Sequence, residues 1–178
     1  LASLGLASLG HAQPSSAPPP SEGSLIDQFG GTLARRQANT SLVSYAGARY
    51  QYASAAMPTG KMASSGLLVE KAAPREIIAG RTFAVEIRVT NILDIPIHEA
   101  TVVDTVNGDV ELGEPTPAPY AVDGPRLEWR FQGLAPGESR SIRYSAKGDR
   151  AAMLNACAWA QYIPGLCQPI HIVEADLD

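Results

Sequence analysis

An alternation of apolar and polar side chains with a period of two residues constrains this chain more than any other feature. Apolar residues occupy every second position in residues 83–89, 127–131 and 142–146, with charged, hydroxyl-bearing or small residues between them. Successive side chains of a β-strand point to opposite faces, so each segment predicts a strand with one buried and one solvated face. Trp129 is the largest apolar residue in these segments, and we expect it at the centre of the core.

Turn-forming residues separate these segments. They are Ala79-Gly80, Asn107-Gly108, Asp123-Gly124-Pro125, Pro136-Gly137 and Lys147-Gly148-Asp149. Asn-Gly is typical of a two-residue type I′ hairpin, which we expect at Asn107-Gly108. Short alternating strands with such spacing predict an all-β fold, an immunoglobulin-like antiparallel β-sandwich of about seven strands. We expect strands at 67–71, 82–91, 99–106, 109–112, 126–131, 139–147 and 153–161, and a further short strand at 168–173.

The part of the chain before this sandwich has a different composition. We therefore divide the whole chain into residues 1–12, residues 13–65 and the sandwich, residues 66–178. Residues 15–24 contain three consecutive prolines among Ser, Glu and Gly, which is typical of a linker. The part that follows is poor in apolar mass but carries aromatic residues. One interpretation is disorder. The other is an extended, mostly irregular arm that becomes ordered on a partner, anchored by Phe29, Tyr45, Tyr50 and Tyr52.

Residues 1–12 indicate export. A run of small and apolar residues ends in Gly10-His11-Ala12, with small residues at the −3 and −1 positions before Gln13. This is typical of the end of a secretory signal with its cleavage site. The alternative is the remnant of an uncleaved membrane anchor. Both interpretations place the protein outside the cytoplasm, in the periplasm, at the outer membrane or on the cell surface.

Cys157 and Cys167 are the only cysteines. In an exported protein an isolated pair usually forms a disulfide, which we expect here. Closing so short a loop would stabilise the fold by roughly 2–3 kcal/mol. Two thiols and three scattered histidines do not make a metal site, and we expect no metal and no cofactor.

A set of short motifs in residues 66–175 resembles the conserved repeat domain of bacterial surface proteins. This domain-of-unknown-function family includes the large cysteine-rich outer-membrane proteins. The motifs, in order, are Leu68-Val69-Glu70-Lys71, Pro74, Ala79-Gly80, Val85-Glu86-Ile87-Arg88-Val89-Thr90-Asn91, Val102-Val103-Asp104, Trp129-Arg130-Phe131, Leu134-Ala135-Pro136-Gly137-Glu138-Ser139 and Asn155-Ala156. The resemblance implies an immunoglobulin-like domain that acts as a spacer, an adhesive module or a structural part. This chain has one copy instead of a tandem array.

The segment 92–98 also departs from the family, since it is more apolar than the usual polar turn. An exposed apolar loop fits a docking surface, so we add Ile92, Leu93 and Ile95 to the candidate contacts.

The sequence contains no recognisable catalytic motif, and we expect no enzyme. Asp104, Asn107 and Asp109 resemble half of a calcium loop but lack the completing Glu, so a turn is the better interpretation. Some immunoglobulin-like surface domains form a Lys–Asn isopeptide bond beside a buried carboxylate. Here Lys71 and Asn155 are the candidates, with Asp104 or Glu70 as the helper. The alternative is that Lys71 points to solvent and Asn155 caps a strand.

These observations predict a non-enzymatic structural or assembly subunit of an extracytoplasmic complex, which docks through its arm and sandwich loops onto other protein subunits. A net charge of −4 gives no reason to expect a nucleic-acid partner. Contact with a membrane is expected to be indirect or through a residual N-terminal anchor. The alternative is a secreted or surface adhesin or ligand-binding module.

Overall fold

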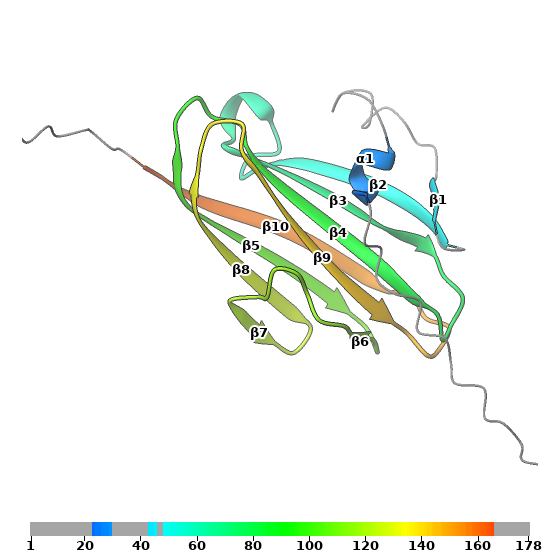
Figure 1. The fold of residues 1–178 in the computed structure, drawn as a ribbon. Helices are drawn as coiled ribbons and strands as arrows, with labels where there is room; N and C mark the ends of the chain where they lie inside the picture. Colours follow the sequence, from blue (N-terminus) through cyan, green and yellow to red (C-terminus); the bar gives the residue numbers. More distant parts are fainter. Residues whose placement is uncertain (1–22, 30–42, 46–47, 166–178) are drawn as a thin grey trace, which may run out of the picture.

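A computed structural model describes residues 23–29, 43–45 and 48–165 of the protein, and these form a two-layered antiparallel β-sandwich (Figure 1). One sheet has six strands in the order β1-β2-β3-β4-β9-β6. The other has four strands in the order β10-β5-β8-β7. The prediction of an all-β sandwich is therefore confirmed.

The bounds of the elements are as follows. The six-stranded sheet contains β1 (Val43–Tyr45), β2 (Ala48–Met57), β3 (Leu67–Glu76), β4 (Thr82–Asn91), β9 (Ser139–Lys147) and β6 (Glu111–Leu112). The four-stranded sheet contains β10 (Asn155–Pro164), β5 (Ile97–Asn107), β8 (Arg126–Leu134) and β7 (Ala121–Asp123). A one-turn helix, α1 (Leu25–Gln28), and a 3-10 turn, η1 (Met62–Ser64), complete the described elements. The seven strands expected at 67–161 are all present, and β1, β2 and β7 are additional.

The alternating segments pack against each other between the sheets. Val85 and Ile87 of β4 are opposite Tyr144 and Ile142 of β9, and all four side chains are buried. Trp129 of β8 is 1 % exposed, which confirms its expected place in the core. Its indole N–H donates to the Pro117 carbonyl at 2.9 Å, so the polar edge of the ring is satisfied.

The boundary expected at residue 65/66 falls inside the sandwich. β2 pairs with β3 from Arg49 opposite Glu76 to Met57 opposite Leu67, so residues before 66 form part of the sheet. The low apolar mass of this segment suggested an irregular arm. Pairing with β3 satisfies its backbone groups without a core of its own, because a strand needs only one buried face.

The prediction of a two-residue hairpin at Asn107-Gly108 is wrong. β5 ends at Asn107, but the next strand, β6, pairs with β9 in the opposite sheet. Residues 108–110 therefore carry the chain from one sheet to the other. Gly108 has a φ of +138°, a backbone conformation that residues with a Cβ rarely adopt, and this explains the glycine.

The outer face of the six-stranded sheet is not solvated along β4 as the alternation predicted. Glu86 is fully buried because α1 lies on it. Its carboxylate accepts hydrogen bonds from the Ser24 hydroxyl at 2.8 Å and from the backbone N–H of Leu25 at 2.5 Å. The helix buries Leu25 and Ile26 in a second apolar cluster outside the sheet, together with Phe29, Tyr50 and Ala72.

Candidate functional site: the cleft and the open edge of β10

A cleft of about 680 Å³ opens between the end of β3 and the start of β10. Core residues form its walls, including Phe83, Val85 and Val106, and Leu154 and Ala156 line the side near β10. At the opposite end of the sandwich the layers meet closely, since the Tyr162 ring would be 2.3 Å from a Cβ added to Gly66. The cleft therefore gives access to the interior at one end of β10.

A buried polar cluster lies beside this cleft. Lys71 of β3 points between the sheets, and its ammonium Nζ is 2.6 Å and 2.8 Å from the two carboxylate oxygens of Asp104 on β5. The Tyr144 hydroxyl of β9 donates to Asp104 Oδ2 at 2.6 Å. The Asp104 side chain is fully buried, and the Lys71 side chain is 11 % exposed. Three strands from both sheets thus meet at one carboxylate.

The electrostatics of this cluster favour a structural role. Burial is the first cause that raises the pKa of Tyr144 far above its ordinary value, and the Asp104 carboxylate is the second. The phenol therefore remains protonated and remains a donor. Lys71 and Asp104 neutralise each other and lie deep in the fold, where removal of one partner leaves an uncompensated charge. The cluster holds the two sheets together.

The structure brings together only two of the three candidate isopeptide residues. Lys71 contacts Asp104, but Asn155 is exposed and is paired with Asn107, three positions along β5 from Asp104. Because side chains alternate along β5, Asn107 faces the side of the sheet opposite to Asp104, and Asn155 faces the same way. Glu70, the other candidate helper, accepts a hydrogen bond from the Tyr52 hydroxyl on the outer face of the six-stranded sheet. This geometry gives no support to a Lys71–Asn155 bond.

The structure does not show the predicted Cys157–Cys167 disulfide. Cys157 is a free, exposed thiol within β10, and Cys167 lies outside the described residues.

The expected docking residues of the arm are used within the chain. Phe29 and Tyr50 are 5 % and 2 % exposed, and the Phe29 ring contacts that of Tyr52 at a centroid distance of 5.5 Å. Tyr45 lies on β1, with its side chain outside the described set. In the apolar loop, Ile92 and Leu93 are half-buried, and only Ile95 is well exposed, at 44 %.

β10 is an edge strand of the four-stranded sheet. Within the described residues no strand pairs with its second edge. Its ten residues include no charged side chain. Trp159 and Ile163 on its outward side are 40 % and 56 % exposed. Pro164 is opposite Ile97, and Gly165 donates to the Pro96 carbonyl, so the apolar loop 92–97 adjoins the end of β10.

Sequence reasoning missed three residues that the structure makes prominent, namely Glu86, Tyr144 and Trp159. Glu86 looked solvated because nothing in the local pattern reveals a helix from 60 residues away. Tyr144 was expected in the core without a polar partner, although Asp104 alternates with the apolar residues Val102 and Val106 and a buried carboxylate needs hydrogen-bond donors. Trp159 alternates with the small residues Ala158 and Ala160, and this contrast was the available signal.

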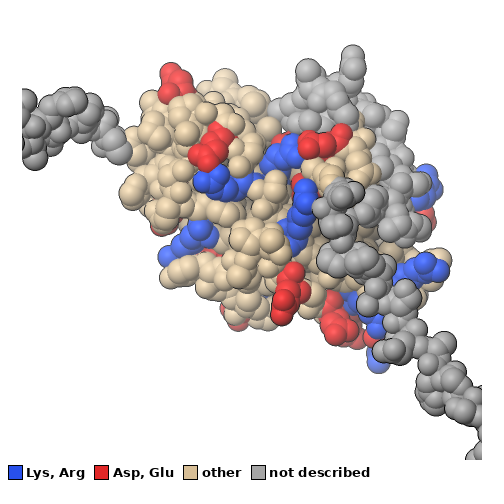
Figure 2. Space-filling view, in the orientation of Figure 1, with Lys and Arg blue, Asp and Glu red and all other residues tan. Residues whose placement is uncertain are grey.

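Other surfaces of the described residues offer no comparable site. In Figure 2, basic and acidic residues are interspersed on the visible face. No group of three or more metal-ligating side chains occurs in residues 23–29, 43–45 and 48–165. No helix in this part of the chain is long and apolar enough to cross a membrane. Residues 1–12, where the signal tail or anchor was expected, lie outside the description.

Comparison with known proteins does not assign the chain to a family. No protein-family model matches the chain, and no curated protein is significantly similar to it.

Proposed function

We propose that the protein is a non-enzymatic structural subunit of an extracytoplasmic assembly, and that it docks onto other protein subunits. The observation that carries the proposal is an exposed apolar strip along one side of the sandwich. We define this docking strip as Ile95, Trp159 and Ile163. The strip replaces the tyrosines of the arm as the contact surface, since Tyr50 and Phe29 are buried in the chain itself.

The chemistry of the docking strip fits a protein partner. The cores of protein interfaces are depleted in charged residues and enriched in aromatic ones, and tryptophan is frequent among the residues that dominate binding. Trp159 is directly opposite Val103 on β5, and Val103 is fully buried. The indole thus rests on a rigid sheet and still has surface left to bury. This pre-organisation lowers the entropy lost on binding.

The polar groups of the cleft support a structural function over a catalytic one. The Lys71 ammonium is paired with Asp104, and the protonated Tyr144 hydroxyl donates to the same carboxylate. A general base or nucleophile needs a free lone pair in reach of a substrate, and this cluster uses its groups to join the sheets.

The extracytoplasmic location rests on the sequence of residues 1–12 and on the resemblance to bacterial surface-protein repeats. A free Cys157 is compatible with either side of a membrane and gives no preference. Cleavage before Gln13 predicts a mature N-terminus that sequencing of the purified protein identifies directly.

The experiment compares tagged wild-type protein with Trp159→Lys, Ile163→Lys and Ile78→Lys after gentle extraction from the envelope fraction of the native host. Ile78 is 67 % exposed, but it lies in the turn between β3 and β4 and serves as the matched control. The wild type and Ile78→Lys should run in a large stoichiometric complex. Each strip variant should lose at least tenfold in co-purified partner, as expected when a residue worth about 1.4 kcal/mol or more is removed.

Two outcomes contradict the proposal. One is a wild-type protein that runs alone, at the size of a single copy. The other is equal recovery of partner with all three variants, each shown by circular dichroism to be folded. Either result would favour the second candidate, an adhesin or ligand-binding module. The cleft of about 680 Å³ favours that candidate, because its size and its mixture of apolar and polar lining residues suit a small ligand.

A further inference from the structure

The inner face of β10 is covered at one end of the strand and open at the other. Its even-numbered residues face the interior, and their exposure falls along the strand: Ala156 is exposed, Ala158 is half-buried and Ala160 is 4 % exposed. Ala156 is nevertheless directly opposite Val106, a core residue that is 3 % exposed. The two layers therefore separate where β10 begins, and the cleft of about 680 Å³ lies between them.

Apolar residues of both layers face this cleft. Phe83 and Val85 come from β4 in the six-stranded sheet, and Val106 comes from β5 in the four-stranded sheet. Leu154 and Ala156 continue the apolar surface at the start of β10. Ligand pockets commonly have volumes of about 300–1,000 Å³ and mostly apolar walls, so this cleft suits a molecule with an extended apolar body.

The mouth of the cleft carries an arginine at a β-bulge. Tyr50 of β2 is opposite Pro74 of β3. The preceding residue, Arg49, is opposite Glu76, so Arg75 has no residue opposite it. Bulges of this kind redirect a side chain and often adjoin active sites. Here the bulge lies at the end of β3, and Arg75 lines the cleft.

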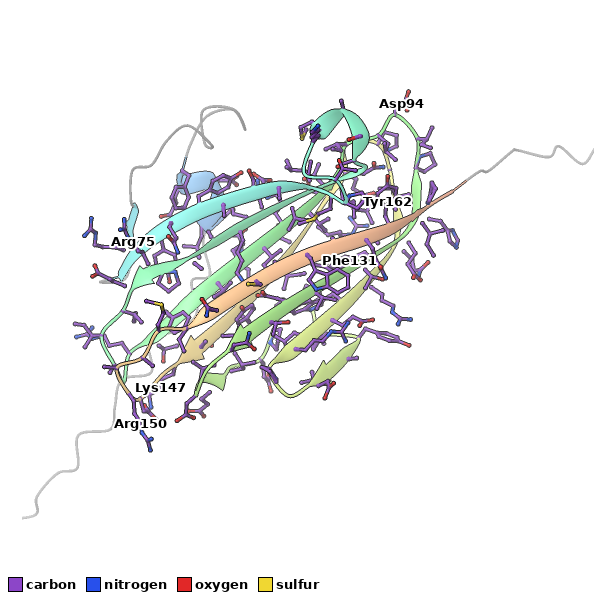
Figure 3. The ribbon with its side chains drawn as sticks, turned by 180° about the vertical axis from the view of Figure 1, so that it is seen from behind. Arg75, Asp94, Phe131, Lys147, Arg150 and Tyr162 are labelled. Carbon is purple, nitrogen blue, oxygen red and sulfur yellow. The ribbon has the colours of Figure 1, made fainter. Side chains whose placement is uncertain are left out.

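The Arg75 guanidinium is available to an anionic group. Arg75 is exposed, at the same end of the sandwich as Lys147 and Arg150 (Figure 3). Within the described part of the chain no carboxylate forms an ion pair with Arg75, whereas its neighbour Glu76 is 3.7 Å from the Arg49 guanidinium. A guanidinium can bind a carboxylate through two parallel hydrogen bonds, which makes a carboxylate the matching group at this mouth.

The floor of the cleft determines which way such a ligand lies. Lys71 and Tyr144 line the cleft, and both donate hydrogen bonds to Asp104. The Lys71 ammonium and the Asp104 carboxylate have opposite charges, so the floor has no net charge to attract an anion. Lys71 and Arg75 are four residues apart on β3, about 13 Å along an extended strand. The anionic group therefore belongs at Arg75, with an apolar body that reaches inward.

We propose that the cleft binds a medium-chain alkyl carboxylate, with the carboxylate on Arg75 and the alkyl chain between Phe83 and Ala156. The chain leaves water for apolar walls, while the charge remains at the mouth and is not desolvated in the interior. This site goes beyond the proposed docking function and does not depend on it. Trp159 and Ile163 of the docking strip lie on the outward side of β10, and the cleft lies on its inward side.

Titration calorimetry of the purified full chain with decanoate, below its micelle concentration, tests the site. We expect saturable binding of one decanoate per chain. Arg75→Ala should weaken this binding about threefold or more, as expected for an exposed ion pair. Arg150→Ala removes an equal charge at the same end but does not alter the cleft lining, and it should bind decanoate as the wild type does. The uncharged 1-decanol should bind equally to the wild type and to Arg75→Ala.

A second pair of variants locates the alkyl chain. Ala156→Trp introduces a ring into the cleft from an exposed position, and it should weaken decanoate binding about tenfold or more because the indole takes the volume that the chain needs. Asn155→Trp introduces the same ring on the opposite face of β10 and should bind as the wild type does. Circular dichroism checks that each variant is folded.

Three outcomes would overturn the inference. The first is no saturable binding of decanoate to the wild type. The second is binding of several decanoates per chain that neither Arg75→Ala nor Ala156→Trp reduces, which would indicate detergent-like adsorption. The third is equal decanoate affinity of the wild type and Arg75→Ala, or an equal loss of 1-decanol binding, since either would remove the carboxylate from Arg75. Trp159→Lys should keep the wild-type decanoate affinity, so failure of this inference is distinguishable from failure of the docking proposal.

Discussion

Asp104 holds Lys71 across the interior of the sandwich, with the ammonium 2.6 Å from one carboxylate oxygen and 2.8 Å from the other. The two residues belong to different sheets, and neither has another sheet-to-sheet ion pair beside it among the described residues. Core packing holds the rest of the interface, so this pair is the polar element that fixes how β3 lies over β5.

Replacement of Asp104 by Asn should destabilise the fold by about 3–5 kcal/mol, because the Lys71 ammonium is then buried without a counter-charge. Urea denaturation measures the free energy of unfolding. The matched control is Asp149→Asn, which removes an exposed ion pair with Lys147 and should change that free energy by about 0.5 kcal/mol or less. Similar effects of the two substitutions would show that the buried pair contributes no more than a surface one.

Tyr144 should make stability depend on pH in the alkaline range. Its pKa is raised in the folded protein, so above pH 10 the unfolded chain loses a proton that the folded chain keeps. The contribution is present in full below pH 10 and is lost as the pH rises above it. Urea unfolding at pH 9 and pH 11 should show a larger loss for wild type than for Tyr144→Phe. Equal losses would mean that the phenol ionises alike in both states.

Glu86→Gln should release α1 from the sheet. The carboxylate accepts hydrogen bonds from Ser24 and from the N–H groups of Leu25 and Ile26. A glutamine side chain has only one acceptor oxygen, and its NH2 group donates hydrogen bonds instead of accepting them. We expect at least tenfold faster hydrogen exchange at Leu25 and Ile26, which corresponds to about 1.4 kcal/mol. Glu111→Gln, at an exposed position of β6, should leave those two amides protected.

Asn91→Ala should loosen the loop 92–97. The buried Asn91 side chain donates to the carbonyls of Ile95 and Leu134 and accepts from the N–H of Leu93. Loss of the side chain leaves these backbone groups without their partner, with an expected destabilisation of about 2–3 kcal/mol. Thermal unfolding measures the change, and the exposed Asn107→Ala serves as the control. A change of the same size in both variants would contradict the role assigned to Asn91.

The strands of the core were predictable because buried apolar residues alternate with polar ones along them. β4 and β9 have the bounds expected from the alternation, Thr82–Asn91 and Ser139–Lys147. β2 was not predicted, since its many small residues leave little periodic signal and its pairing with β3 uses backbone groups that every residue has. Its Tyr50 is buried in the cluster around α1, and nothing in the sequence of β2 shows that this helix packs there.

The candidate site was predictable only in part, for a related reason. Lys71 and Asp104 were chosen as the amine and a helper carboxylate of a possible isopeptide bond, and the structure joins these two side chains. Asn155 was chosen from its position near the start of the last strand, but the register decides which face a residue occupies. A shift of one residue reverses that face, and no local pattern around Asn155 fixes it.

The hydrogen bonds of Asp104 reach 33 residues back to Lys71 and 40 residues forward to Tyr144. Loop closure over such separations is slow compared with the formation of a neighbouring hairpin such as β3–β4. The three side chains therefore meet only after the two layers have docked in their native alignment. The ultraviolet absorbance of tyrosinate at alkaline pH thus distinguishes a finished sandwich from a collapsed chain that already contains its strands, because only the finished one keeps the Tyr144 proton.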